Sequence, residues 1–273
     1  MESTLIQRKE FFMARTSLSA IEQRNTRMLE YMHDHSSVTV EELAQYLHVS
    51  EVTVRRDLNY LLNEKMILRT SAGHYALNED PSFDVALFKR YSAHHLEKSM
   101  IARAALNLIP TGSVIGLDSS TTVLELGKIL TQKENLTVVT NNLFIPAYLC
   151  QHPSLKLFLA GGTVYLACNS TEGADTCRAI SCFHYDIVFL SANAFDFQYG
   201  LSNMDFESVD AKLAFLDHAD RCVVLLDSSK IGKHAGRMFL PTSRIHTVVT
   251  DSHITPEQVE QFRQLEIPLV IAE

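Results

Sequence analysis

Several loops of this sequence carry hydroxyl, amide and glycine residues directly after short apolar runs. The most informative loop places a carboxylate before four consecutive hydroxyl residues and opens a helical stretch: Asp118, Ser119, Ser120, Thr121 and Thr122. Backbone N–H groups and the helix dipole at such a turn attract an anion, and the hydroxyls add donors for phosphate oxygens. Asp118 could hold sugar hydroxyls or act as a base. Ser and Thr at this position also serve as ordinary helix N-caps.

Three further loops repeat the pattern, and they contain Thr140, Asn141 and Asn142, then Gly161 and Gly162, then residues 227–230. Ligands of open α/β sheets bind at the carboxyl ends of the strands, so the four loops together predict one site for a polyhydroxylated anion. Lys230 is expected to supply the compensating charge. The glycine pair is not a dinucleotide fingerprint, and the sequence has no P-loop motif, so no nicotinamide or ATP cofactor is expected.

The apolar runs before these loops resemble buried parallel strands, because most are continuous rather than alternating. Helical patterns separate most of them, and this β-α-β rhythm predicts a doubly wound, mostly parallel α/β sheet. The expected strands are residues 113–117, 136–140, 155–160, 186–190, 221–226, 247–250 and 268–271. The expected helices are residues 121–131, 143–151, 205–218 and 255–264, and a further helical region begins at about residue 84.

Residues 19–77 have a different pattern, of three helices followed by a short hairpin. Thr39 and Glu42 have the spacing of a capping box at the start of one helix. Ser50 can cap the helix that follows. The apolar residues of that second helix recur at i, i+4 and i+7 and predict an inward stripe, formed by Val54, Leu58 and Leu61.

The opposite face of the same helix is polar and basic. In a helix-turn-helix, the second helix places such residues in the major groove of DNA, where Arg pairs with guanine edges or phosphate. A hairpin at residues 67–77, turning near Gly73, would complete a winged helix-turn-helix, whereas a plain helical hairpin with a solvated face is the alternative. Asp57 falls on the inner side and is expected to orient a neighbouring Arg. The predicted DNA contacts are Ser50, Thr53, Arg55, Arg56, Asn59 and Arg69.

The stretch from Val49 to Leu58, which reads VSEVTVRRDL, resembles the signature of the DeoR family of bacterial repressors. The later loops resemble the C-terminal sensor of that family, and Lys212 and the Gly-Leu-Ser of residues 200–202 match it as well. The resemblance implies a sensor with the fold of ribose-5-phosphate isomerase and an effector that is a phosphorylated sugar or sugar derivative. It places Lys212 among the effector-binding residues. It also implies a repressor of a carbohydrate-metabolism operon.

This sequence departs from the family pattern in two places. Many members have a His-Gly-Gly-Ala wing tip, and here residues 71–74 read SAGH. Many carry a Glu-Ala pair four residues before the position of Lys212, and here Ser208 and Val209 stand in that place. The far end of the ligand is therefore expected to be held differently.

Length and composition limit the number of domains and the classes of partner. The 273 residues suit one large or two unequal domains, and the net charge of −8 argues against a non-specific nucleic-acid coat. The expected division is an arm at residues 1–18 that is poorly ordered, a winged helix-turn-helix at 19–77, a linker at 78–83 and a sensor at 84–273. No signal peptide or apolar span is evident, so a cytoplasmic location and no membrane partner are expected.

Three readings of the whole chain differ in class. The first is a ligand-responsive regulator of operator DNA, assembled as a dimer or tetramer because operators usually mirror a two-fold axis. The second is a sugar-phosphate isomerase-like or CoA-transferase-like enzyme on the same fold, which would not need residues 39–77. The third is a DNA-binding module whose C-terminal domain serves only for oligomerisation. No metal site is expected, because the histidines lack partners at ligand spacing: His33, His35, His94 and His95.

Overall fold

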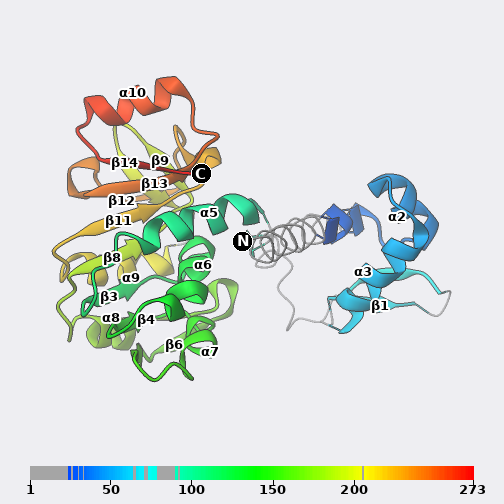
Figure 1. The fold of residues 1–273 in the computed structure, drawn as a ribbon, viewed down its shortest axis with the longest axis horizontal. Helices are drawn as coiled ribbons and strands as arrows, with labels where there is room; N and C mark the ends of the chain where they lie inside the picture. The colour runs from blue at the N-terminus through cyan, green and yellow to red at the C-terminus, as the bar shows by residue number, and fades with distance from the viewer. Residues whose placement is uncertain are drawn as a thin grey trace, which may run out of the picture. The chain divides into compact units, whose positions relative to one another are not determined.

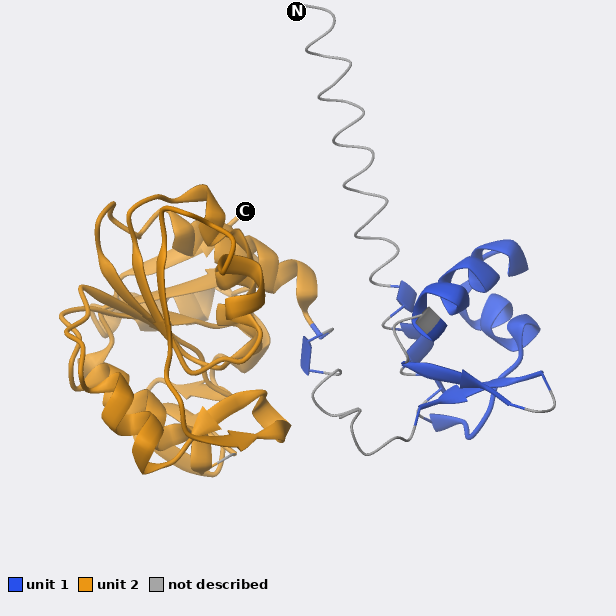
Figure 2. Cartoon of the chain, turned by 90° about the horizontal axis from the view of Figure 1, so that it is seen from below, with its two compact units in different colours: residues 1–93 blue, residues 94–273 orange. Residues whose placement is uncertain are grey.

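The computed structural model divides the chain into two compact units, an N-terminal unit of residues 1–93 and a C-terminal unit of residues 94–273 (Figure 2). The predicted arm at residues 1–18 and residues 79–83 of the predicted linker lie outside the described part of the chain. The described residues are 24–25, 27–29, 31–32, 34–63, 66–70, 73–78, 90–91, 93–204 and 206–273.

The N-terminal unit contains the predicted helix-turn-helix. Helix α2 (Val40–Leu47) begins with the capping box, in which the Thr39 side chain accepts from the Glu42 N–H and the Glu42 carboxylate accepts from the Thr39 N–H at 2.7 Å. His48, at a φ of 54°, ends the helix in the left-handed conformation. Ser50 then accepts from the N–H of Thr53 at 3.3 Å and starts helix α3 (Glu51–Asn63), as predicted.

A small apolar core holds this unit together. The predicted stripe of α3 lies in it, because Val54, Leu58 and Leu61 are each at most 1% exposed. Strands β1 (Ile67–Arg69) and β2 (Tyr75–Leu77) pair antiparallel and form the predicted wing, with the left-handed Gly73 between them. The remaining core residues come from the described part of the preceding helical segment, from the short stretch before α2, from α2 and from the wing: Met28, Leu29, Met32, Val38, Val40, Leu43, Leu47, Ile67 and Tyr75.

The C-terminal unit is built on a seven-stranded parallel sheet of order β14-β13-β11-β8-β3-β4-β5 (Figure 1). All seven strands fall within or beside the predicted ranges, because most are continuous apolar runs. Their bounds are β3 Val114–Leu117, β4 Thr137–Thr140, β5 Lys156–Leu159, β8 Ile187–Leu190, β11 Cys222–Leu225, β13 Thr247–Asp251 and β14 Leu269–Ala272.

Helices cover both faces of this sheet, as the predicted doubly wound fold requires. One core cluster joins alternate strand residues such as Val188 and Val224 to Ile180, Phe215 and Phe262, which lie on α8, α9 and α10. Helix α5 packs against α6 and contributes no residue to that cluster. The helices are α5 His95–Leu106, α6 Thr121–Ile129, α7 Ile145–Leu149, α8 Ala174–Ile180, α9 Glu207–Leu216 and α10 Pro256–Gln264.

Two smaller sheets were not predicted. One has the order β12-β10-β9, and the other is the antiparallel hairpin of β6 and β7. Their bounds are β6 Thr163–Tyr165, β7 Ser170–Glu172, β9 Ala194–Asp196, β10 Gly200–Asn203 and β12 Arg237–Leu240. Among the described residues, no helix has the length and hydropathy to cross a membrane.

Candidate DNA-reading surface and ligand site

The exposed face of α3 carries the residues that the sequence predicts for DNA. The Arg56 side chain is 68% exposed, and Asn59 is exposed on the same helix. Arg55 is exposed as well, but its guanidinium lies 3.2 Å from the Glu51 carboxylate. Of the two arginines on this face, Arg56 is therefore held less tightly by its own helix than Arg55.

Three other residues predicted to contact DNA, Ser50, Thr53 and Arg69, also interact with groups of the protein itself. The hydroxyl of Ser50 lies 2.9 Å from that of Thr53 while it caps α3, so both are oriented by the helix start. Arg69, on the wing strand β1, is exposed, and its guanidinium lies 6.0 Å from the centre of the Tyr75 ring. All six predicted residues thus lie in the N-terminal unit, with Ser50 at the cap of α3, four on α3 itself and one on the wing.

Asp57 points inward, as the sequence indicated, and is 2% exposed. Its carboxylate forms an ion pair with the Nε of Arg24, from the helical segment that precedes α2. The Nε of Arg56 lies 3.9 Å from its other oxygen. Asp57 therefore joins α3, the recognition helix, to the preceding helical segment and also neighbours Arg56, the more exposed of the two arginines of α3.

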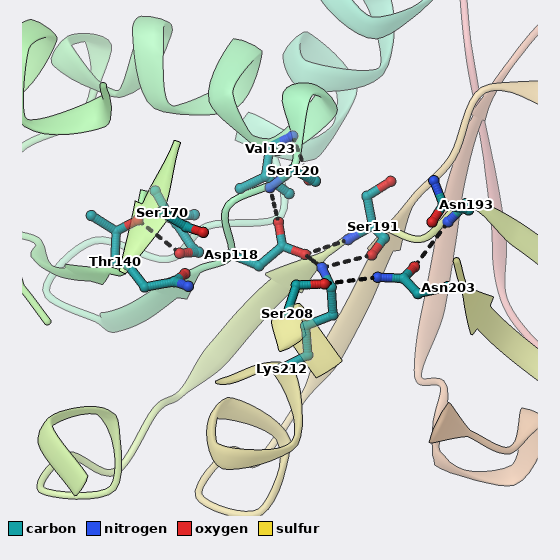
Figure 3. Close-up of polar contacts among 12 residues, drawn as sticks. Asp118, Ser120, Val123, Thr140, Ser170, Ser191, Asn193, Asn203, Ser208 and Lys212 are labelled. Carbon is teal, nitrogen blue, oxygen red and sulfur yellow. Dashed lines mark hydrogen bonds and ion pairs between the residues drawn. The ribbon is translucent and has the colours of Figure 1, made fainter. Parts of the chain in front are cut away.

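In the C-terminal unit, the predicted loops lie at the carboxyl ends of the parallel strands, and Asp118 is the centre of a buried polar cluster there (Figure 3). One carboxylate oxygen accepts from the N–H of Ser120 at 2.9 Å. The other accepts from the N–H of Ser191, also at 2.9 Å, and from the ammonium of Lys212. Lys212 donates a further hydrogen bond to the Ser191 carbonyl at 3.0 Å.

This cluster joins three elements that are distant in sequence: the turn after β3, the end of β8 and helix α9. Asp118 is 1% and Lys212 4% exposed, so water solvates neither group and each compensates the charge of the other. Both residues were predicted to contact the effector. The structure brings the two residues together, and their ion pair also holds the three elements of the site in position.

The four hydroxyl residues at the start of α6 have different environments. Ser120 is the N-cap and accepts from the Val123 N–H at 3.2 Å. Thr121 is half-buried and Ser119 is buried. Thr122 is completely buried, and its hydroxyl has no hydrogen-bond partner among the described groups. A buried hydroxyl without a partner is uncommon and requires an explanation.

The loop after β4 is mostly satisfied by its own hydrogen bonds. The Thr140 hydroxyl donates to the Leu117 carbonyl at 2.8 Å and accepts from the Asn142 N–H at 3.0 Å. The Asn142 Oδ1 accepts from the Phe144 N–H at 2.8 Å. One atom of each amide is buried without a described partner, the Oδ1 of Asn141 and the Nδ2 of Asn142. These two atoms and the Thr122 hydroxyl are polar groups at the same edge of the sheet that could form hydrogen bonds with a ligand.

Close packing against Thr176 explains why glycine is needed in the loop after β5. A Cβ at Gly162 would lie 1.9 Å from the Thr176 hydroxyl oxygen, so no side chain fits there. The Thr176 hydroxyl donates to the Gly161 carbonyl at 3.0 Å, which ties α8 to this loop. Gly161 itself is exposed and has open space around it.

Lys230, the predicted charge partner of the anion, has a carboxylate of its own. Its ammonium lies 3.3 Å from Asp227, in the single 3-10 turn Ser228–Lys230. Burial raises the pKa of the Asp227 carboxyl, but Lys230 and the hydroxyl of Ser229 outweigh burial and hold that pKa below its usual value. Asp227 is therefore ionised at neutral pH, and the pair is close to neutral.

The predicted effector-binding residues did not include four residues of the site: Ser191, Asn193, Asn203 and Ser208. The amide of Asn203 donates to the Ser208 hydroxyl at 3.1 Å and accepts from the Asn193 N–H at 3.0 Å (Figure 3). The hydroxyl of Ser191 is buried without a described partner. The signal was present, since Ser191 to Asn193 also follow a continuous apolar strand.

The two units together define a class of protein. A winged helix-turn-helix with an exposed basic face reads DNA, and a doubly wound domain with buried, unused polar groups at its strand ends accepts a small ligand. A chain with both is a ligand-sensing transcription regulator.

Family models identify the particular family. The DeoR-like helix-turn-helix domain matches residues 24–79, and the DeoR C-terminal sensor domain matches residues 93–252. The chain belongs to the DeoR family of transcription regulators, which confirms the resemblance seen in the sequence. The family consists of DNA-binding regulators, and the enzyme alternative is not supported.

Curated relatives align along nearly their whole length. The HTH-type transcriptional regulator GolR of Listeria innocua is 29% identical over 92% of this chain and 98% of its own. The glycerol-3-phosphate regulon repressor of Escherichia coli K12 is 30% identical over 84% of this chain and 90% of its own. Among solved structures, ribose 5-phosphate isomerase A of Methanocaldococcus jannaschii aligns over 51% of this chain and 55% of its own, with 18% identity and a TM-score of 0.38.

Proposed function

We propose that this regulator represses a carbohydrate-metabolism operon and that a phosphorylated sugar or sugar derivative changes its affinity for operator DNA. The observation that carries the proposal is the start of α6, where a helix N-terminus adjoins the buried, unpartnered hydroxyl of Thr122. The named function of the glycerol-3-phosphate regulon repressor supports both the repression and the ligand class. Operator DNA places the protein in the cytoplasm, and a two-fold operator calls for a dimer or tetramer.

The electrostatics of the site suit an anion. Asp118 is neutralised by Lys212 and Asp227 by Lys230, so no unpaired carboxylate of these two pairs would repel a phosphate. The first N–H groups of α6 have no intrahelical acceptor and carry the positive end of the helix dipole. We therefore propose that the phosphate binds at the start of α6 and that the sugar hydroxyls face Ser191, Asn203 and Ser208, which offer hydroxyl and amide partners.

Arg56→Ala tests the DNA-reading half of the proposal. Loss of an exposed arginine that contacts DNA should weaken operator binding by about 1–3 kcal/mol without unfolding the protein. The matched control is Arg178→Ala, because Arg178 is also an exposed helical arginine with an acidic neighbour, Asp175, but lies in the C-terminal unit. Operator affinity is measured by fluorescence anisotropy. An Arg56→Ala protein that binds like the control would remove Arg56 from the interface.

Thr122→Val tests the ligand-binding half. Valine keeps the shape of the side chain and removes a buried hydroxyl without a partner, so the free protein should gain about 1 kcal/mol in stability. The same change should raise the effector concentration needed for half-maximal operator release at least fivefold, since one hydrogen bond of about 1 kcal/mol is lost.

Thr250→Val is the matched control. Thr250 is also completely buried with an unpartnered hydroxyl, but it lies on β13, three strands from β3 in the sheet. This variant should be stabilised without a change in response. The effector is the sugar phosphate that most raises the melting temperature of the wild type. A normal response from Thr122→Val would place the phosphate elsewhere, and a panel that produces no shift would refute the ligand class.

A further inference from the structure

One edge of the large sheet is open. Strand β5 pairs with β4 on one side, and no described strand pairs with its other side. The N–H groups of Lys156 and Ala160 donate to β4-side carbonyls, at 2.8 Å each. Because alternate residues of a strand point their N–H groups in opposite directions, those of Leu157 and Leu159 point away from the sheet. An exposed edge of this kind is a template for pairing with another chain.

Apolar side chains surround this edge. Helix α7 packs against β5, and α7 and β6 lie at the same end of the sheet as β4 (Figure 1). Five large apolar residues of β5, of these elements and of the turn after β6 are between 44% and 67% exposed, and we call them the edge patch: Tyr148, Phe158, Leu159, Val164 and Leu166. Such a concentration of large apolar residues marks an interaction surface.

The segment that carries the edge patch has few charges of its own, and a cation from α6 that approaches it, Lys128 at 5.8 Å from the centre of the Tyr148 ring, is paired with Glu125. Residues 143–168 contain one charged residue, Lys156, although 21% of the whole chain is charged. A two-fold axis brings a surface against its own copy, so every charge near the axis would meet a like charge. Lack of charge is therefore what a self-complementary surface needs, whereas DNA would need a basic surface.

We propose that the edge patch is the interface with a second copy of this chain, in which the two β5 strands pair antiparallel across a two-fold axis. The inference deepens the two-fold assembly expected of the proposed function. With about 150–250 Å² for each large side chain, the edge patch exposes roughly 400–500 Å² per copy. Two copies then come close to the ~1,000 Å² that a specific interface requires, and the backbone of β5 adds to this.

The opposite edge of the sheet is protected. Strand β14 has one exposed large apolar residue, Ile271. The adjoining helix α10 and the turn after it carry many charges, which discourage edge pairing: Glu257, Glu260, Arg263 and Glu266. Ile271 therefore provides a control on the same sheet.

The test is the molar mass of the full chain, measured by light scattering after size-exclusion chromatography and without DNA or effector. Leu159→Pro removes an outward N–H and leaves the bonds to β4 in place, which edge strands tolerate. Leu166→Glu adds a charge at the most exposed residue of the edge patch. We expect the wild type to be a multiple of the single chain, both variants to fall to half that mass or less, and Ile271→Glu to match the wild type.

Circular dichroism checks that each variant is folded, and Leu166→Glu decides the question if Leu159→Pro is not. A wild type with the mass of one chain would overturn the proposal. It would also fall if the folded edge-patch variants keep the wild-type mass, or if Ile271→Glu alone dissociates the assembly. Operator and effector are absent from this measurement, so its failure is distinguishable from failure of the proposed function, which rests on affinity and response.

Discussion

Lys212→Met is expected to lower the free energy of unfolding of the C-terminal unit by about 3–5 kcal/mol, because it leaves the Asp118 carboxylate buried without its cation. The N–H groups of Ser120 and Ser191 continue to donate to that carboxylate, but they do not neutralise it. Urea denaturation of the full chain, followed by hydrogen exchange of peptides from each unit, measures the loss. Peptides from residues 34–63 should exchange as in the wild type.

Two further variants test the cause. Lys230→Met removes a similar cation from a pair in which Asp227 is 1% exposed but the lysine side chain is 23% exposed. It should cost less, because the Ser229 hydroxyl still donates to Asp227 and water can enter beside the partly exposed position of the lysine. The double variant Asp118→Asn with Lys212→Met removes both charges and should recover part of the loss. A Lys212→Met protein as stable as Lys230→Met would show that the buried pair does not hold the three elements together.

Local patterns predicted the sheet well, because most of its seven strands are continuous apolar runs and the central strands β8 and β11 are buried at every residue. They failed where burial depends on distant partners. Strand β10 is polar, with Ser202 and Asn203 buried between β9 and β12, so no apolar pattern marks it. Helix α8 is seven residues long and has no side-chain cap, so it lacks a start signal.

The same limit applies to the ligand site. The polar loops were found because each follows a strand, and their convergence follows from parallel topology. The partner of Asp118 could not be read from spacing, because Lys212 lies 94 positions away in the sequence. Lys230 was favoured as the charge partner of the ligand, and the structure shows that its neighbour Asp227, three positions away, already neutralises it.

The buried pair of the N-terminal unit predicts an effect on DNA binding without DNA contact. Asp57→Ala leaves Arg24 without its carboxylate in a side chain only 15% exposed, and it also removes the anion beside Arg56. We expect a loss of about 3–5 kcal/mol in the stability of this unit. Operator affinity should fall more than tenfold, because the recognition helix is no longer held against the preceding helical segment.

Glu51→Ala is the contrasting control. Glu51 is also an acidic residue of α3 with an arginine partner, but both side chains of that pair are more than half exposed. Exposed pairs contribute about 1 kcal/mol or less, and removal of an exposed carboxylate beside DNA should leave affinity unchanged or slightly higher. Anisotropy titrations at fixed salt compare the two variants, and hydrogen exchange of α3 peptides reports stability. If Asp57→Ala binds operator as tightly as Glu51→Ala does, the ion pair with Arg24 does not position the recognition helix. Asp57 would then contribute to the stability of this unit and not to DNA binding.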